Sequence, residues 1–482
     1  MSLLLALLMV VSVFASCGET KPNDEDKNDT TASTSGDDTT EKVLPQLNWG
    51  GQEYRVLGKE STTTWAHSFE VYREEMPEDV VGKAVYERNQ ALYDKYGFVV
   101  SGKLTSSYNS TAKTALESGD DLYDLMILSP ESFHPHAMSG YLLNLYELDY
   151  INMDHNGWMD YPNEQLSMGG RLYYTTNKFL LQDKNRSWLL YYNREMAREL
   201  NLGYFEESVF DGSWTLDKLI EVGKKATSDS DGQPGMTIED NWGVAVAEHY
   251  SFTQFAYGAG FRFTEQGSDG YPVLLGASDK IISTLDAVYG LTANKDVYYC
   301  DQDYGTVNWD DCADQMFYEG RALTLAMCVS ALDYLGSEVD FEFGILPNPK
   351  LDDKQEDYYS IPNLGNGSLF AVPATVIDPA FAGFALQALT EESVDTTYNT
   401  YIETKCKLQD AFDEDAAKCL DLVFEGIVYD IAFVSDIGGL GSMMRGTLGG
   451  LSNNTFGRLF DRLKKIADKE MATIKETYST LP

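Results

Sequence analysis

Basic residues and histidine are scarce in this chain. It carries 36 Lys and Arg against 76 Asp and Glu, with 5 His, so its formal net charge is −40 over 482 residues. Nucleic acids and anionic membrane surfaces attract basic patches, so this balance argues against binding to either. The charge favours solubility but does not identify a ligand.

The sequence also lacks the motifs of several enzyme classes. It contains no GxSxG elbow, no HExxH helix and no recognisable Cys/His signature. Glycoside hydrolysis needs only two carboxylates, roughly 5–10 Å apart, and with so many acidic residues their abundance proves nothing. A secreted carbohydrate-active hydrolase therefore stays open as an alternative.

Cysteine is sparse, with six residues. Leaving Cys17 aside, Cys300, Cys312, Cys328, Cys406 and Cys419 form an odd set without CxxC spacing, which fits neither a zinc site nor a complete disulfide framework. A single pair, such as Cys300 with Cys312 or Cys406 with Cys419, is compatible with an oxidising compartment. Buried free thiols are the favoured interpretation.

Other stretches that suggest metal or nucleotide binding are incomplete. Residues Asp229–Asp240 partly resemble a calcium loop, but Pro234 occupies the place that needs Gly, and His134 and His136 have no further clustered ligands. The Gly-rich stretch Gly438–Gly450 lacks the GK[ST] ending of a P-loop. We therefore expect no metal, nucleotide or other cofactor.

Only the first residues form a long apolar run. Met1–Ser16 has the length of a signal-peptide apolar region and is too short to span a bilayer permanently. The segment Phe14–Cys17 resembles the bacterial lipobox, which implies a signal peptide over 1–17 and lipidation at Cys17, although no Lys or Arg precedes the run. The polar residues 18–44 predict a disordered tether.

Strand-like and helix-like segments alternate after the tether. Strands are expected at Glu53–Leu57, Phe98–Ser101 and Leu122–Leu128, with helices at Val80–Tyr96 and Thr111–Ser118. This βαβαβ order predicts a parallel sheet whose ligands lie beyond the carboxyl ends of its strands.

A second body follows, with Thr215 as a plausible helix N-cap. Its expected strands are Trp188–Asn193, Ala322–Met327 and Phe341–Ile345. The expected helices are Ser278–Ala293, Asp310–Tyr318, Pro373–Leu389 and Leu459–Tyr478.

Short motifs over Asn48–Tyr478 resemble, in their order and spacing, the extracellular solute-binding protein family 1 of carbohydrate ABC importers, the group that includes maltose-binding protein. The motifs are Ala84–Asn89, Tyr123–Met126, Gly140–Leu145, Tyr191–Asn193, Trp214–Asp217, Phe317–Ala322 and Gly344–Lys350, with Gln355, Tyr358 and Tyr359 behind them.

The resemblance implies an α/β, two-lobed periplasmic-binding-protein fold of type II. Each lobe is a mostly parallel sheet flanked by helices, and a multi-strand hinge joins the lobes. The expected N-terminal lobe is 45–182 plus 370–432, and the C-terminal lobe is 183–369 plus 433–482. The chain is expected to cross between lobes near Leu180–Arg186, Ser360–Ala371 and Tyr429–Gly438.

The resemblance also implies a function. A monomeric extracytoplasmic lipoprotein, anchored to the cell membrane, captures a sugar in the interlobe cleft and delivers it to ABC permease transmembrane subunits without acting as an enzyme. A surface adhesin without a transport role is a further alternative.

A sugar site needs aromatic platforms together with directional hydrogen-bonding side chains. The chain has 31 Tyr, 22 Phe and 7 Trp, most of which must fill the core. By their place in the family pattern, the expected ligand-binding residues are Trp65, Ser129, Glu131, Asp183, Asn185, Arg186, Trp188, Tyr257 and Arg445. Which sugar they bind is not specified by the sequence.

Overall fold

The computed structural model describes residues 43–61, 67–305, 313–410 and 413–481. The lipobox Cys17, the predicted ligand residue Trp65 and Cys312 lie outside these ranges. Residues 44–482 form one compact unit. Within the described ranges, no helix combines the length and the apolar character needed to cross a membrane.

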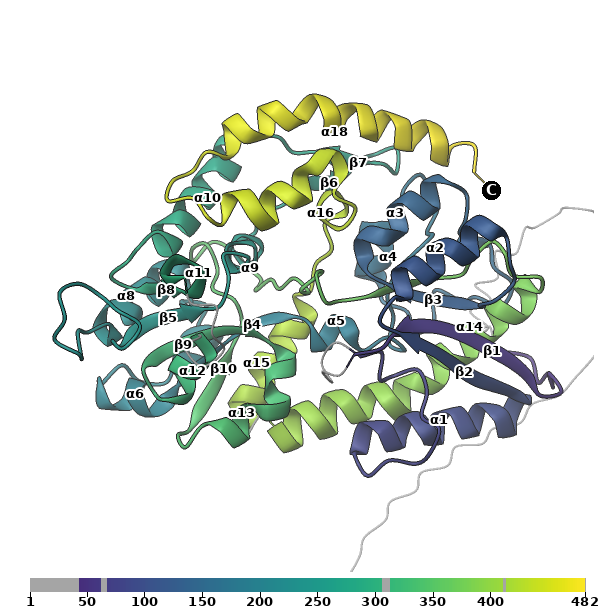
Figure 1. Cartoon of the computed structure of the whole chain (residues 1–482), viewed down its shortest axis with the longest axis horizontal. Helices are drawn as coiled ribbons and strands as arrows, with labels where there is room; N and C mark the ends of the chain where they lie inside the picture. Colours follow the sequence, from purple (N-terminus) through teal and green to yellow (C-terminus); the bar gives the residue numbers. More distant parts are fainter. Residues whose placement is uncertain (1–42, 62–66, 306–312, 411–412, 482) are drawn as a thin grey trace, which may run out of the picture. The chain divides into compact units, whose positions relative to one another are not determined.

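The first of two main sheets combines three strands from the start of the folded chain with one from a much later segment (Figure 1). Among the described residues its four strands lie in the order β11-β3-β1-β2, and only β11 runs antiparallel to its neighbour. The strands are β1 (Gln52–Lys59), β2 (Phe98–Thr105), β3 (Leu125–Leu128) and β11 (Leu369–Ala371). Its helices are α1 (Val80–Tyr96), α2 (Tyr108–Ser118), α3 (Pro130–Met138), α4 (Asp160–Leu166) and α14 (Pro379–Ser393).

The bounds of α1 follow from local chemistry. The Asp79 carboxylate caps its first turn by accepting the N–H of Gly82 at 2.6 Å. Gly97 ends the helix with a φ of 69°, a left-handed conformation that glycine adopts without steric cost, and β2 begins at the next residue. The sequence therefore predicted both ends of this helix correctly.

The second main sheet has five strands among the described residues, in the order β10-β4-β9-β5-β8. Strand β4 runs antiparallel to both of its neighbours, while β9, β5 and β8 are mutually parallel. The strands are β4 (Trp188–Asn193), β5 (Trp242–Val246), β8 (Tyr298–Cys300), β9 (Ala322–Cys328) and β10 (Phe343–Leu346). A separate hairpin joins β6 (Thr264–Gln266) and β7 (Pro272–Leu274).

Helices follow most strands of the second sheet. Thr215 caps one of them, as predicted, by accepting the N–H of Lys218. They are α6 (Arg194–Glu199), α7 (Phe205–Phe210), α8 (Leu216–Ala226), α9 (Ser251–Gly258), α10 (Asp279–Thr292), α11 (Asp301–Tyr304), α12 (Ala313–Tyr318), α13 (Leu332–Glu338) and α15 (Glu414–Glu425). The remaining segments include α5 (Gln182–Asn185), α16 (Ile431–Val434), α17 (Leu440–Ser442) and α18 (Phe456–Tyr478).

The predicted start of α14 at Pro373 is wrong. Asp378 accepts the N–H of Phe381 at 3.0 Å, and Pro379 occupies the first helical turn, so the helix begins six residues later. Helix α15 also departs from expectation, because it packs against β10 of the second sheet, whereas the predicted N-terminal lobe included residues 370–432. The lobe boundaries themselves stay predictions.

Three segments that connect the sheets run side by side. Ser187 pairs with Pro362, and Ser360 pairs with Ile427. Ser360 and Pro362 belong to the second predicted crossing, while Ser187 and Ile427 lie within two residues of the first and the third. The amide of Ser360 donates to Gly426 O at 2.8 Å, and the amide of Val428 donates to Ser360 O at 2.9 Å. These bonds make the connection a multi-strand element.

The C-terminal helix α18 contacts elements of both sheets. Its Phe456 ring lies 5.7 Å from Phe261, next to the β6–β7 hairpin, and its Tyr478 ring lies 5.1 Å from Tyr173. Glu470 reaches the buried His134 of α3 at 3.7 Å. Helix α18 therefore packs against segments associated with the first sheet and against segments associated with the second.

Cysteine follows the favoured interpretation in the described residues. Cys300, Cys328, Cys406 and Cys419 are buried thiols, and no disulfide joins any two of these four. The pairing of Cys406 with Cys419 is therefore absent.

A buried acidic residue lies behind the first sheet. Glu70 is completely buried, and burial raises its pKa from 4.5 to about 7, against the lowering effects of its own backbone, Arg73, Gln182 and Arg88. The Arg88 guanidinium donates to the backbone oxygens of Glu70 at 2.7 Å and Val71 at 3.2 Å. Arg88 therefore binds the backbone of Glu70 and Val71. The Glu70 carboxylate itself remains costly to ionise.

We expect Glu70→Gln to change the pH dependence of stability. Because the folded-state pKa is raised, the folded protein binds the extra proton between pH 4.5 and 7, and stability falls as pH rises through that window. Removing the carboxylate should abolish a decrease of about 3 kcal/mol in the free energy of unfolding. Urea unfolding between pH 4 and 8 measures it, with the exposed Glu75→Gln as control. An unchanged slope in Glu70→Gln would contradict this account.

Candidate functional site

The carboxyl ends of strands from both sheets supply one group of polar and aromatic side chains. In the first sheet, β1 ends at Lys59 and β3 is followed by Ser129. In the second sheet, β9 ends at Cys328, opposite Trp188 at the start of the antiparallel β4. The turn after β5 leads through Tyr250 into α9. Such strand ends are where ligands bind in open α/β sheets.

The first sheet contributes a hydrogen-bonded polar cluster. The Ser129 hydroxyl lies 2.7 Å from the Tyr108 hydroxyl and accepts from the Asn109 side-chain amide at 3.0 Å. The Lys59 ammonium lies 5.8 Å from the centre of the Tyr108 ring. Glu131 is exposed in the first turn of α3. Hydroxyl, amide, ammonium and carboxylate groups therefore meet at this edge.

The second sheet contributes two aromatic rings and two guanidinium groups. The Trp188 and Tyr250 rings lie 5.9 Å apart at an angle of 38°. Arg445 places its guanidinium 5.3 Å from the Phe433 ring, and Arg186 donates to the Ser330 hydroxyl at 2.6 Å. This edge therefore combines flat apolar surfaces with directional donors.

Electrostatic effects connect the two edges. Burial raises the pKa of Tyr250, Arg445 lowers it, and the Glu131 carboxylate from the first sheet raises it. Burial also lowers the pKa of Lys59, and Arg186 lowers it further. Each effect requires the charged group to lie close to its target. Glu131 and Lys59 therefore lie near Tyr250 and Arg186.

Two buried N–H groups at this site have no hydrogen-bond partner among the described residues. They are the indole Nε1 of Trp188 and the Nη1 of Arg445. Leaving a buried donor unsatisfied costs about 1–3 kcal/mol, more for a charged group. Because both atoms are covered in this structure, a ligand's acceptor oxygen would remove that cost only after the site opened to admit it.

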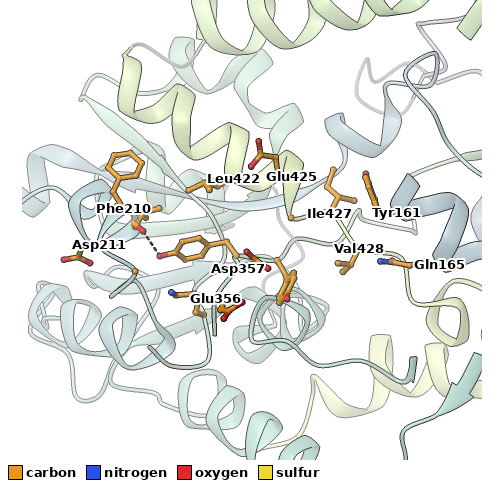
Figure 2. A pocket seen from close by; sticks show the side chains of 16 residues that line it. Tyr161, Gln165, Phe210, Asp211, Glu356, Asp357, Leu422, Glu425, Ile427 and Val428 are labelled. Atoms are coloured by element: carbon orange, nitrogen blue, oxygen red, sulfur yellow. Dashed lines mark hydrogen bonds between the residues drawn. The ribbon is translucent and has the colours of Figure 1, made fainter. Parts of the chain in front are cut away.

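A separate cavity lies beside the connecting segments (Figure 2). It has a volume of about 600 Å³. Figure 2 shows Tyr161 and Gln165 at one side and Phe210 and Asp211 at the other, and its dashed line marks the Tyr358 hydroxyl donating to Val209 O at 3.0 Å. Four carboxylates and one ammonium are among the lining groups: Asp211, Glu356, Asp357, Glu425 and Lys350. This cavity is acidic and shares none of the predicted ligand residues.

No family model matches the sequence, and none of the curated proteins searched matches it. Solved structures do match. The ABC substrate-binding protein Lmo0181 from Listeria monocytogenes, in complex with cycloalternan, is 16% identical with a TM-score of 0.52, and the match covers 88% of this chain and 99% of that one. A cyclo/maltodextrin-binding protein complexed with maltotetraose is 13% identical with a TM-score of 0.54, over 90% and 99% of the two chains. The chain has the two-lobed α/β fold of ABC substrate-binding proteins.

A third structure with this substrate-binding fold has a different ligand. UgpB from Mycobacterium tuberculosis, in complex with glycerophosphocholine, is 15% identical with a TM-score of 0.54, over 88% of this chain and 99% of that one. The predicted fold class is confirmed, and the resemblance to the maltose-binding-protein group is confirmed at the level of the fold.

Within this fold, five of the predicted ligand residues come together. They are Ser129, Glu131, Arg186, Trp188 and Arg445. Ligand contact itself remains a prediction for all of them.

Asn185 faces a neighbouring cavity. Its side-chain amide donates to the Tyr401 hydroxyl at 3.1 Å, and its carbonyl oxygen has no partner among the described residues. The cavity has a volume of about 480 Å³ and is also lined by Phe69, Arg73 and Lys405. Asn185 precedes Arg186 of the main group in sequence, but its own side chain lines this other cavity.

The side chains of Asp183 and Tyr257 are engaged with other residues of the protein. The Asp183 carboxylate forms an ion pair with Lys184 at 2.8 Å, with both side chains at most 2% exposed. The Tyr257 hydroxyl donates to the Asp430 carboxylate at 3.1 Å. Asp430 also accepts from the Thr264 hydroxyl at 2.7 Å and caps α16. Both residues hold parts of the fold together.

Sequence reasoning missed Lys59, Tyr108, Asn109 and Tyr250. Lys59 ends β1, which the sequence predicted to end at Leu57, so the rule of strand ends pointed close to Lys59 without including it. Tyr250 precedes α9 by one residue, in a turn whose sequence shows no ligand motif. Only its contact with Trp188 identifies it.

The calcium-like loop is stabilised as a turn. The carboxylates of Asp229, Asp231 and Asp240 converge. Asp240, however, accepts the backbone N–H groups of Ser230 and Thr237, each at 2.7 Å. Its oxygens are therefore already used by the backbone.

We expect Tyr257→Phe to lower stability because it removes one hydrogen bond from the buried Asp430. The expected loss is about 1–2 kcal/mol in the free energy of unfolding, measured by urea unfolding. Tyr204→Phe, at a position 48% exposed, is the matched control. If both variants unfold at the wild-type midpoint, the Tyr257–Asp430 contact does not stabilise the fold.

Proposed function

We propose that the protein is an extracytoplasmic substrate-binding lipoprotein of an ABC importer that captures a sugar or oligosaccharide between the strand ends of its two sheets. One observation carries the proposal: Trp188 Nε1 and Arg445 Nη1 are buried donors without a partner among the described residues, beside the Trp188–Tyr250 ring pair. Sugar rings offer apolar faces to aromatic rings and acceptor oxygens to N–H groups.

The arrangement suits binding that is linked to closure. Lys59, Ser129 and Glu131 come from the first sheet, whereas Trp188, Tyr250 and Arg445 come with the second. A ligand that touches both groups gains its full contacts only when they are close together, so it stabilises the closed state. Family resemblance assigns recognition of this state to the permease transmembrane subunits.

The neighbours support a polar, oxygen-rich ligand. Two of them are complexed with cycloalternan and maltotetraose, and the third with glycerophosphocholine. An oligosaccharide is the better fit to this chain because the ring pair of Trp188 and Tyr250 offers a stacking surface. On this account the protein binds its sugar and releases it unchanged, without acting as an enzyme.

Sugar binding is tested by a thermal-shift screen against mono- to tetrasaccharides, including maltotetraose. A ligand that binds the native state raises the melting temperature by mass action. For the sugar that gives the largest shift, we expect Trp188→Ala and Arg445→Met each to raise the Kd by about 30-fold or more, as for truncation of a central anchor.

Phe210→Ala is the matched control, because Phe210 lines the acidic cavity of Figure 2 and is 47% exposed. It should leave sugar affinity unchanged. If Phe210→Ala loses sugar binding while Trp188→Ala retains it, the sugar binds in the acidic cavity and not at the candidate site. Release of cleaved products from an oligosaccharide would instead favour the hydrolase.

Membrane anchoring through Cys17 is tested separately. We expect Cys17→Ala to move the protein from the membrane fraction to the soluble fraction of the expressing bacterium and to abolish incorporation of labelled palmitate, because acyl chains supply the membrane affinity. Cys419→Ala is the control, since that thiol is buried. Unchanged palmitate labelling of Cys17→Ala would exclude Cys17 as the lipidated residue, and membrane retention of the unlabelled variant would contradict its role as the sole anchor.

A further inference from the structure

Three residues with metal-binding side chains meet at one end of the second sheet. Strands β5 and β8 are parallel neighbours, with Val246 beside Cys300. His249 lies in the turn that follows β5, Cys300 is the last residue of β8, and Asp303 belongs to α11 directly after it. The two strands therefore end side by side and carry all three residues to the same edge.

The donor atoms are close together. His249 Nδ1 lies 3.6 Å from Cys300 Sγ, and His249 Nε2 lies 3.3 Å from an oxygen of Asp303. One nitrogen of His249, the Cys300 sulfur and an Asp303 oxygen all lie within 4.8 Å of one another. Cys300 is buried, while the side chains of His249 and Asp303 are 25% and 32% exposed. The group is therefore open to solvent on one side.

This spacing fits a tetrahedral metal site. With bonds of about 2.3 Å to sulfur and about 2.0 Å to nitrogen at a tetrahedral angle, zinc holds those two donors about 3.5 Å apart. Imidazole, thiolate and carboxylate together suit zinc and related late transition metals better than calcium or magnesium, which prefer oxygen ligands. Asp303 contacts the Nε2 side of the ring, so its carboxylate must turn toward the Nδ1 side to reach the third position, and solvent would supply the fourth.

Existing contacts position these residues. The His249 amide donates to the Gln302 side-chain oxygen at 3.0 Å, which joins the β5 turn to α11. Asp303 also forms an ion pair with Lys295, an exposed cation that a metal ion would displace. Burial raises the pKa of the Cys300 thiol to about 12, so a metal ion must displace its proton. Metal affinity should accordingly increase with pH.

We propose that His249, Cys300 and Asp303 form a binding site for a divalent transition-metal ion of the zinc class. The sequence predicted no metal site, because His249 lies 51 positions before Cys300 and the three residues form no ligand-spacing motif. The site adjoins Tyr250 of the candidate sugar site, but it does not depend on the proposed function, and its test needs no sugar.

The test uses purified full-length protein and Co²⁺ as a spectroscopic probe for Zn²⁺. We expect tetrahedral d–d bands and a thiolate-to-cobalt charge-transfer band, both removed by one equivalent of Zn²⁺. Cys300→Ser should abolish the charge-transfer band, whereas Cys419→Ser should retain it. Cys17 and Cys312 are present in both variants, so a signal that disappears only with Cys300→Ser comes from Cys300.

Affinity and stability provide a second measurement. Zn²⁺ should raise the melting temperature of the wild-type protein, and His249→Asn and Asp303→Asn should each weaken Zn²⁺ binding by at least about 10-fold. These side chains are partly exposed, so the variants should fold even if Cys300→Ser does not. Absence of a charge-transfer band in the wild type, or full affinity in His249→Asn, would overturn the proposal and leave an S–H···N hydrogen bond as the only contact.

Discussion

The position of the candidate site depends on how the backbone of Trp188 is held. Its N–H donates to Ile361 O at 3.2 Å, and its carbonyl oxygen accepts from the Ser360 hydroxyl at 2.8 Å and from the Asn348 side chain at 3.2 Å. Gln254 of α9 donates in turn to the Asn348 oxygen at 2.7 Å. Because Tyr250 lies immediately before α9, the same network fixes both rings of the pair. Buried polar groups that hydrogen-bond one another in this way favour one arrangement, although the Gln254 side-chain oxygen itself has no partner among the described residues.

Hydrogen-bond pairing distinguishes the residues that stabilise the fold from those proposed to bind the ligand. Around Trp188 every backbone hydrogen-bonding group has a partner, yet its indole N–H has none among the described residues. Asp183 and Tyr257 show the opposite pattern, since their side chains are already paired with Lys184 and Asp430. A paired and buried side chain would have to give up its partner to bind a ligand. The unpaired donors of Trp188 and Arg445 pay no such cost.

Local patterns in the sequence were sufficient for much of the fold. Asp79 and Gly97 define α1 because capping chemistry acts over a few residues, and β4 matches its predicted bounds because it is a short apolar run between polar residues. The predicted strand bounds put Ser129 directly after one strand and Trp188 at the start of another, and the family resemblance singled both out as ligand residues. Residue roles that depend on distant partners could not be predicted. Tyr257 meets Asp430 across 173 positions, and His249 meets Cys300 across 51, with no periodicity to indicate either contact.

The two proposed sites share a structural element, which has a thermodynamic consequence. His249 and Tyr250 are adjacent, so an ion held between His249, Cys300 and Asp303 would restrict the turn that carries Tyr250. If the sugar-bound state needs that turn in its present position, the metal ion removes part of the ordering cost of binding, and the two ligands bind cooperatively. The coupling must be reciprocal: the factor by which metal raises sugar affinity equals the factor by which sugar raises metal affinity. The hydrogen bond from His249 to Gln302 already restricts the same turn. The coupling free energy therefore cannot exceed the conformational entropy that the turn retains with this bond in place.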